Sequence, residues 1–123
     1  MKKVLLVSLL VISLAACQSS KESVEHSTVY IADGSVQCEE GGKTGDETAK
    51  MLTDNAISVS ETQCGHLAVQ AMIAMCGGPT AAINVHTIPT ADLEKAQALG
   101  FKNVLTLKQG DNKGYEATEC KVK

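Results

Sequence analysis

Five cysteines are the feature that most limits how this chain of 123 residues can fold. Four of them lie far apart in the part of the chain that carries strand and helix patterns: Cys38, Cys64, Cys76 and Cys120. The fifth, Cys17, directly follows a largely apolar stretch near the start of the chain. Whether these sulfurs are cross-linked depends on the compartment in which the chain resides. The first residues of the chain therefore have to be interpreted before the fold.

Residues 1–16 have the pattern of a secretory signal peptide. Lys2 and Lys3 form the positive start, and residues 4–16 form a largely apolar stretch of 13 residues. A helix that spans a bilayer needs about 20 such residues, so this stretch is too short for one. The sequence thus predicts export rather than a membrane span.

The segment Leu14-Ala15-Ala16-Cys17 resembles the bacterial lipobox. The resemblance implies cleavage before Cys17 and attachment of lipid to its sulfur and its new amino group. Several acyl chains on one residue give stable membrane anchoring, because each buried methylene contributes about 0.8 kcal/mol. In that family an Asp after the cysteine retains the protein at the inner membrane. Gln18 in this position implies an outer-membrane anchor that faces the periplasm.

Removal of residues 1–16 leaves 107 of the 123 residues, which is enough for one domain. Residues 18–27 are polar and lack apolar periodicity, so we interpret 17–27 as a lipidated flexible tether. Residues 28–123 then form a disulfide-stabilised domain.

Charge and composition exclude several classes of function. Without Lys2 and Lys3, nine lysines remain against 14 acidic residues, a formal charge of −5, and there is no arginine. Nucleic acids and anionic membrane surfaces require clustered cationic side chains, so neither is an expected partner. Only Tyr30, Phe101 and Tyr115 are aromatic, and no phosphate-binding glycine motif occurs, so we expect no cofactor. A basic or neutral protein of the envelope is the partner that this charge favours.

The first half of the domain predicts a strand, a loop and a helix. The segment "TVYIAD" from Thr28 has strand composition and stops at Asp33-Gly34, and Cys38 follows in a Gly-rich, acidic loop. Thr44 and Glu47 have the spacing of a capping box, which predicts a helix start. Asn55 is the predicted left-handed stop of this helix. Residues 57–60 then alternate and predict a half-buried strand that leads to Cys64.

A similar unit follows. "AAINVHTIP" predicts a strand that ends at Pro89, Thr90 is a predicted helix cap, and Leu93, Ala96 and Leu99 form an apolar stripe. Gly100 suits the left-handed end of this helix, with Phe101 folding back on Ala96. "NVLTL", residues 103–107, predicts a further strand. Strand, helix, strand, twice over, predicts an α+β fold: a small ferredoxin-like two-layer sandwich braced by two disulfides.

The segment "HLAVQAMIAMC", residues 66–76, is ambiguous. It is apolar on nearly every side, and its composition is compatible with helix or strand. We expect it to be the most buried part of the domain.

Export to an oxidising compartment predicts that Cys38, Cys64, Cys76 and Cys120 form two disulfides, for which three pairings exist. The 12 steps from Cys64 to Cys76 would span about 18 Å as helix or about 40 Å as strand, whereas bridged Cα atoms lie about 5.5 Å apart. A Cys64–Cys76 bridge therefore requires the segment to bend back on itself.

The order of these features is similar to that in the small outer-membrane sensor lipoprotein family of the Rcs envelope-stress pathway: a loop cysteine, a capped helix, a strand ending in cysteine, then Ala-x-Cys-Gly and an apolar strand. That resemblance implies the pairs Cys64–Cys76 and Cys38–Cys120. The segments "QCE", "CG" and "INVHTI" are also similar to small bacterial envelope lipoproteins for which no activity can be carried over.

Two chemical hypotheses accompany the favoured interpretation. Imidazole and soft sulfur suit copper(I), and a group of such side chains lies within 23 positions: Cys64, His66, Met72, Met75, Cys76 and His86. Cys64 and His66 are the one cysteine and histidine pair close enough in sequence to suggest a thiol-dependent enzyme. Cysteines in disulfides can neither ligate copper nor act as nucleophiles. We therefore favour a non-enzymatic module, without metal or catalytic residues, for protein interaction or envelope sensing.

Overall fold

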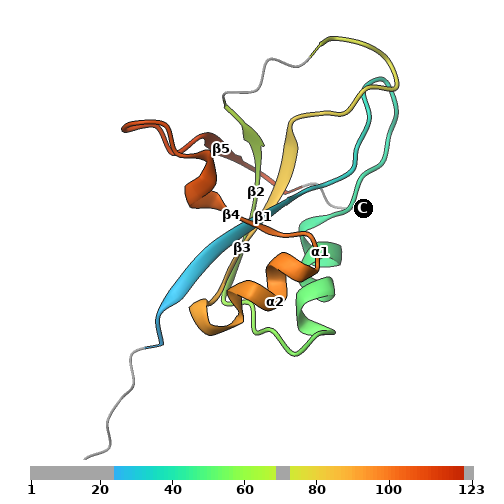
Figure 1. Cartoon of the computed structure of the whole chain (residues 1–123). Helices are drawn as coiled ribbons and strands as arrows, with labels where there is room; N and C mark the ends of the chain where they lie inside the picture. Colours follow the sequence, from blue (N-terminus) through green and yellow to red (C-terminus); the bar gives the residue numbers. More distant parts are fainter. Residues whose placement is uncertain (1–23, 69–72, 121–123) are drawn as a thin grey trace, which may run out of the picture.

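The computed structural model describes residues 24–68 and 73–120, and within them the chain forms a small α+β fold with two disulfides. Cys17 and the predicted signal peptide lie outside the described residues. Five strands and two α-helices follow one another with two short 3₁₀ helices (Figure 1): β1 His26–Ala32, α1 Gly45–Thr53, β2 Glu61–Leu67, β3 Ala82–Pro89, η1 Thr90–Asp92, α2 Leu93–Ala98, β4 Lys102–Asn103, η2 Val104–Leu107 and β5 Tyr115–Thr118.

The strands form one antiparallel sheet in the order β4-β1-β3-β2-β5. β3 lies at its centre and pairs with β1 on one side and β2 on the other. In this register Val29 lies opposite His86, and Cys64 lies opposite Asn84. Because opposite residues of an antiparallel pair point to the same face, His86 and Asn84 share a face with Val29 and Cys64.

Both α-helices pack against that face. Their buried residues Leu52 and Ala96 join strand residues in one core cluster: Val29, Leu52, Ile57, Ile88, Ala96 and Phe101. Ile83, Val85 and Tyr115 form a second cluster, and they point to the opposite face of the sheet. The predicted β1 and β3 strands are thus confirmed, and β1 begins two residues before Thr28.

α1 begins with the predicted capping box. Thr44 Oγ1 accepts from the Glu47 N–H at 3.2 Å, and the Glu47 carboxylate accepts from the Thr44 N–H at 2.7 Å. The predicted stop at Asn55 is wrong, because Ala56 takes the left-handed conformation with φ 61°. The N–H of Ile57 then donates to Leu52 O and that of Ala56 to Thr53 O, which is a Schellman motif.

The same motif ends α2. Gly100 has φ 100°, and the N–H of Phe101 donates to Ala96 O at 3.1 Å, as the sequence predicts. The start of this helix differs from the prediction. Thr90 is the first residue of η1 rather than a cap, and its hydroxyl pairs with that of Ser27 at 2.8 Å.

The strand predicted over 103–107 is wrong beyond Asn103. Val104–Leu107 form η2, because Asn103 Oδ1 accepts from the Leu105 N–H and Thr106 Oγ1 donates to Asn103 O. Such local side-chain bonds compete with a strand ladder for the backbone.

The strand predicted over 57–60 is also displaced, since β2 begins at Glu61. Ile57 belongs to the Schellman motif of α1 and packs in the core beside Leu52. In the ambiguous segment 66–76, residues 69–72 lie outside the described residues, and the described ones include no helix and are not the most buried part of the domain. β2 ends at Leu67, and Ile73 and Met75 are 81% and 61% exposed in the following loop.

Candidate functional site

A cleft of about 780 Å³ lies between the loop before α1, the start of β3 and the end of β5. Its lining residues come from segments far apart in the sequence: Asp33, Glu39, Glu40, Gly41, Gly42, Lys43, Thr44, Gly45, Cys64, Gly65, Ala82, Ile83, Asn84, Thr118 and Glu119. Four of them are carboxylates and one is a lysine, which is a formal charge of −3. The cleft is therefore an acidic site.

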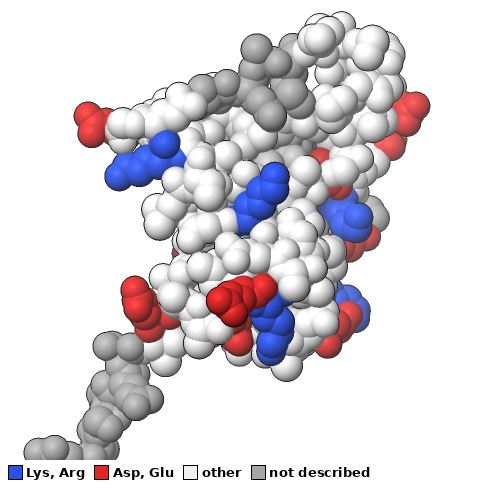
Figure 2. Space-filling model, in the orientation of Figure 1, with Lys and Arg blue, Asp and Glu red and all other residues white. Residues whose placement is uncertain are grey.

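The acidic character of the cleft contrasts with the face displayed in Figure 2. On that face lysine and acidic side chains are interspersed, and no continuous lysine patch is visible.

Asp33 is the buried carboxylate of the cleft, and its Oδ1 accepts from the N–H of Ser35 at 2.8 Å and from the hydroxyl of Ser35 at 2.6 Å. The loop from Glu39 to Lys43 is closed onto this residue, because the Lys43 N–H donates to Asp33 O.

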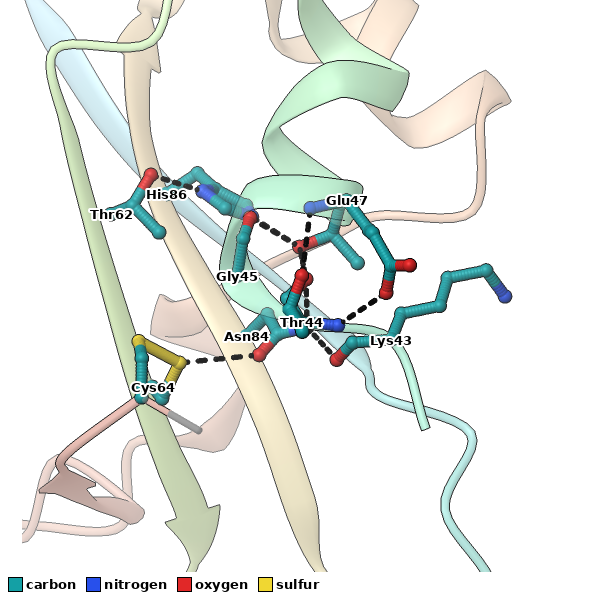
Figure 3. The surroundings of a disulfide bond; sticks show 10 residues. Lys43, Thr44, Gly45, Glu47, Thr62, Cys64, Asn84 and His86 are labelled. Carbon is teal, nitrogen blue, oxygen red and sulfur yellow. Dashed lines mark hydrogen bonds between the residues drawn. A yellow bond between two sulfur atoms is a disulfide. The ribbon is translucent and has the colours of Figure 1, made fainter. Parts of the chain in front are cut away.

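The Cys64–Cys120 disulfide lies beside this cleft, next to the start of α1 (Figure 3). A Cβ atom on Gly45, the first residue of α1, would lie 3.3 Å from each of the two sulfurs. Glycine at this position therefore lets the helix start pack closely against the disulfide. The positive end of the helix dipole faces the same region.

Asn84 joins the disulfide to the loop that precedes α1. Its side-chain amide donates to the carbonyl oxygens of Lys43 and Thr44 at 3.0 and 3.2 Å, and its Oδ1 lies 3.4 Å from Cys64 Sγ (Figure 3). Asn84 is only 3% exposed. These contacts hold the cleft wall at the start of β3 against the start of α1.

His86 extends this polar cluster towards the core. Its Nδ1 is 2.9 Å from Thr62 Oγ1, and its Nε2 is 2.7 Å from Thr48 Oγ1. Thr48 donates its hydroxyl proton to the carbonyl of Gly45, so it accepts from Nε2–H, and Nδ1 accepts from Thr62. Burial lowers the pKa of His86 from 6.5 to about 4 because it disfavours the charged imidazolium. His86 is therefore a neutral structural group at neutral pH.

The disulfide pairs are Cys38–Cys76 and Cys64–Cys120, so the pairing expected from the Rcs resemblance is wrong. The sheet explains one pair: Cys64 lies opposite Thr118, two residues before Cys120 and on the same face. Loop contacts explain the other. The backbone of Gln37 exchanges hydrogen bonds with Gly77 and Gly78, which places Cys38 beside Cys76.

The residues of the copper hypothesis do not converge. His66 pairs with Glu116 across β2 and β5 at 3.0 Å, whereas His86 is enclosed by two threonines. Met75 is exposed, Met72 lies outside the described residues, and Cys64 and Cys76 are in separate disulfides. Within residues 24–68 and 73–120, no three His, Cys, Asp or Glu side chains form a group that could hold a metal ion.

In the pair suggested for thiol catalysis, the Cys64 sulfur is bonded to Cys120, so Cys64 has no free thiol to act as a nucleophile beside His66.

Among the helices that the structure describes, none has the length and the apolar composition needed to cross a bilayer.

Sequence reasoning missed Asn84, Thr48 and Thr62, the polar side chains that organise the site. Only Thr48 had a local signal, as the residue after the capping box.

Comparison with family models, curated proteins and solved structures found no match to this chain.

Proposed function

We propose that this protein is a lipid-anchored envelope module without enzymatic activity, which binds a basic segment of a protein partner in its acidic cleft. Cys17 would carry the lipid and hold the domain at the outer membrane, facing the periplasm. The single observation that carries the binding role is the cleft of about 780 Å³ with its formal charge of −3.

The chemistry of the cleft supports a cationic occupant. Glu39, Glu40 and Glu119 are exposed carboxylates around Asp33, and Lys43 is the one cation among the lining residues. Such a site attracts lysine or arginine side chains and repels acidic ones. The volume is that of a site for a few side chains, which suits a short extended segment better than a whole folded surface.

The disulfides and the lipobox resemblance support an envelope location. Both bonds close long loops, with sequence separations of 38 and 56 residues. Bonds of this kind persist in oxidising compartments such as the bacterial periplasm. The lipobox at Leu14 to Cys17 adds a membrane anchor to the predicted export signal.

We also propose that the domain has the ferredoxin-like two-layer arrangement. The order β4-β1-β3-β2, with α1 between β1 and β2 and α2 between β3 and β4, supports this class. β5 would then be an added fifth strand beside β2. Contacts between α1 and α2 across one sheet face, measured by nuclear Overhauser effects, would test the arrangement.

Photocrosslinking in intact cells tests the binding role. A photoreactive residue replaces Gly41 in the cleft, and the crosslinked partner peptide is identified by mass spectrometry. The expected product is a peptide with net positive charge, whose yield falls about tenfold in the Glu39→Gln/Glu40→Gln variant, equivalent to about 1.4 kcal/mol. The matched control is Glu25→Gln/Glu94→Gln, which removes the same charge elsewhere.

An acidic or neutral crosslinked peptide, or equal yields in the two double variants, would contradict the proposed role of the cleft. The anchor is tested separately by the mass of the N-terminal peptide. Cys17 should carry acyl chains, and Cys17→Ser should release the protein from the membrane fraction.

A further inference from the structure

The two disulfides differ in what else holds the segments that they join. Beside Cys38–Cys76, Gln37 provides several independent contacts. Its backbone N–H donates to Gly78 O, and its carbonyl accepts from Gly77 N–H. Its side chain donates to Ile73 O and Pro79 O and accepts from Met75 N–H. These loops therefore stay joined without the disulfide.

The β2–β5 ladder supports the Cys64–Cys120 disulfide only as far as Thr118, which lies opposite Cys64. β5 ends at Thr118, and within residues 24–68 and 73–120 neither Glu119 nor Cys120 makes another hydrogen bond or ion pair. Thr118 and Glu119 line the acidic cleft. The disulfide is thus what fastens residues 119 and 120 at this end of the cleft wall.

The two cysteine residues also differ in exposure. Cys64 is 8% exposed, whereas Cys120 is an exposed residue at the end of the described chain. We therefore expect an incoming thiolate to attack the sulfur of Cys120, with Cys64 as the leaving group. Cys64 would leave beside the start of α1, where the helix dipole stabilises a thiolate.

Asn84 is arranged to receive the reduced form of Cys64. Its two amide protons are used by Lys43 O and Thr44 O, which fixes its Oδ1 towards the sulfur at 3.4 Å. A disulfide sulfur has no proton to donate to this buried oxygen. A Cys64 thiol does have one, so reduction supplies a donor that the oxidised state lacks.

We propose that Cys64–Cys120 is a thiol–disulfide exchange site for a dithiol protein, and that its redox state controls the end of the acidic cleft. The control of the cleft rests on the proposed function. Reduction frees residues 119 and 120, and Glu119 no longer contributes its charge to the cleft. The oxidised protein is then the form that binds a basic segment.

The exchange is a two-step transfer of two electrons. A thiolate of the dithiol forms a bond to Cys120 Sγ, and the Cys64–Cys120 bond breaks with its electron pair going to Cys64 Sγ. Cys64 takes a proton from water. The second thiol of the reactant loses its proton and attacks the reactant sulfur that is now bonded to Cys120. This releases the Cys120 thiolate, so the dithiol is oxidised and the protein disulfide is reduced.

The first experiment maps the attacked sulfur and needs no variant. The oxidised full chain in detergent is treated briefly with glutathione, free thiols are alkylated, and the peptides are identified by mass spectrometry. Glutathione, which has one thiol, should be found on Cys120 and the alkyl group on Cys64. Glutathione on Cys64 in equal or greater amount would overturn the assignment of the exchange site.

The second experiment measures control of the cleft with a fluorescent tetralysine peptide. We expect the peptide to bind the Cys64→Ser/Cys120→Ser variant about tenfold more weakly than the oxidised wild type. The Cys38→Ser/Cys76→Ser variant is the matched control and should stay within twofold of wild type, because Gln37 still holds its loops.

The outcomes separate the two proposals. Equal affinity of wild type and Cys64→Ser/Cys120→Ser would overturn redox control of the cleft. A peptide that does not bind even the oxidised wild type would instead contradict the proposed function, and the glutathione map then decides the exchange site alone.

Discussion

His86 in the centre of β3 and Thr48 in α1 are joined by a hydrogen bond of 2.7 Å, and this contact connects the helix to the sheet inside the core. His86 is fully buried, with Phe101 in edge contact at 6.0 Å between ring centroids. Three groups of the fold therefore depend on a neutral imidazole: the start of α1, the start of β2 through Thr62, and the core residue Phe101.

The pKa of His86 predicts a loss of stability in mild acid. It is 6.5 when unfolded and about 4 when folded, so the unfolded chain binds more protons between these values. Stability therefore rises with pH through this window. The contribution of neutral His86 to the free energy of unfolding is complete above about pH 6.5. As the pH falls towards 4, this free energy decreases by about 3 kcal/mol.

Urea unfolding at a series of pH values measures this loss. The His86→Gln variant should have a smaller slope of unfolding free energy against pH between 4 and 6.5 than the wild type. The same slope in wild type and His86→Gln would show that other groups cause the acid sensitivity.

Replacement of Thr48 by valine should cost about 1–3 kcal/mol, because the buried Nε2–H of His86 loses its acceptor while the side-chain volume is kept. Thr48→Ser retains the hydroxyl and should lose less than half as much. The midpoint of urea unfolding at pH 7, with an unchanged m-value, is the measurement. If the serine and valine variants are equally unstable, packing of the methyl group rather than the hydrogen bond is what stabilises this contact.

Removal of the capping box by Thr44→Ala should lower the free energy of unfolding by about 1 kcal/mol, because the Glu47 N–H loses its acceptor. Thr53→Ala at the exposed end of the same helix is the control and should change stability by less than about 0.5 kcal/mol. Thermal unfolding followed by circular dichroism distinguishes the two. Equal losses would show that the cap contributes no more than ordinary helix propensity.

The two Schellman motifs predict opposite effects of matched substitutions. Ala56 has φ 61°, so Ala56→Gly should relieve a left-handed alanine and stabilise the fold by about 0.5–1 kcal/mol after the entropy cost of glycine. Gly100 has φ 100°, so Gly100→Ala should destabilise it by about 1 kcal/mol. Chemical denaturation of both variants measures the signs, and a stability loss in Ala56→Gly would contradict the interpretation.

Local patterns in the sequence were sufficient to predict the elements whose signals involve neighbouring residues. The Thr44 and Glu47 capping box, the strands around Val29 and Val85 and the Gly100 helix end are all confirmed, since each depends on interactions within a few positions. The existence of two disulfides is confirmed as well. Lipidation of Cys17, export and the partner remain predictions.

Errors occurred where a local signal was weak or a competing contact was stronger. The end of α1 carries Ala56 at the left-handed position, where the usual glycine or asparagine signal is missing. Residues 103–107 have strand composition, yet Asn103 draws them into a short 3₁₀ helix.

The cysteine pairing and the cleft could not be derived from local patterns. Cys64 meets Cys120 only because β5 pairs with β2, and Asn84 reaches the start of α1 only because β3 lies at the centre of the sheet. These are contacts between segments separated by tens of residues, and their geometry follows from strand order and register. Chain composition and spacing therefore account for the local elements, whereas the packing of the sheet brings four carboxylates, a disulfide and a buried amide to one site.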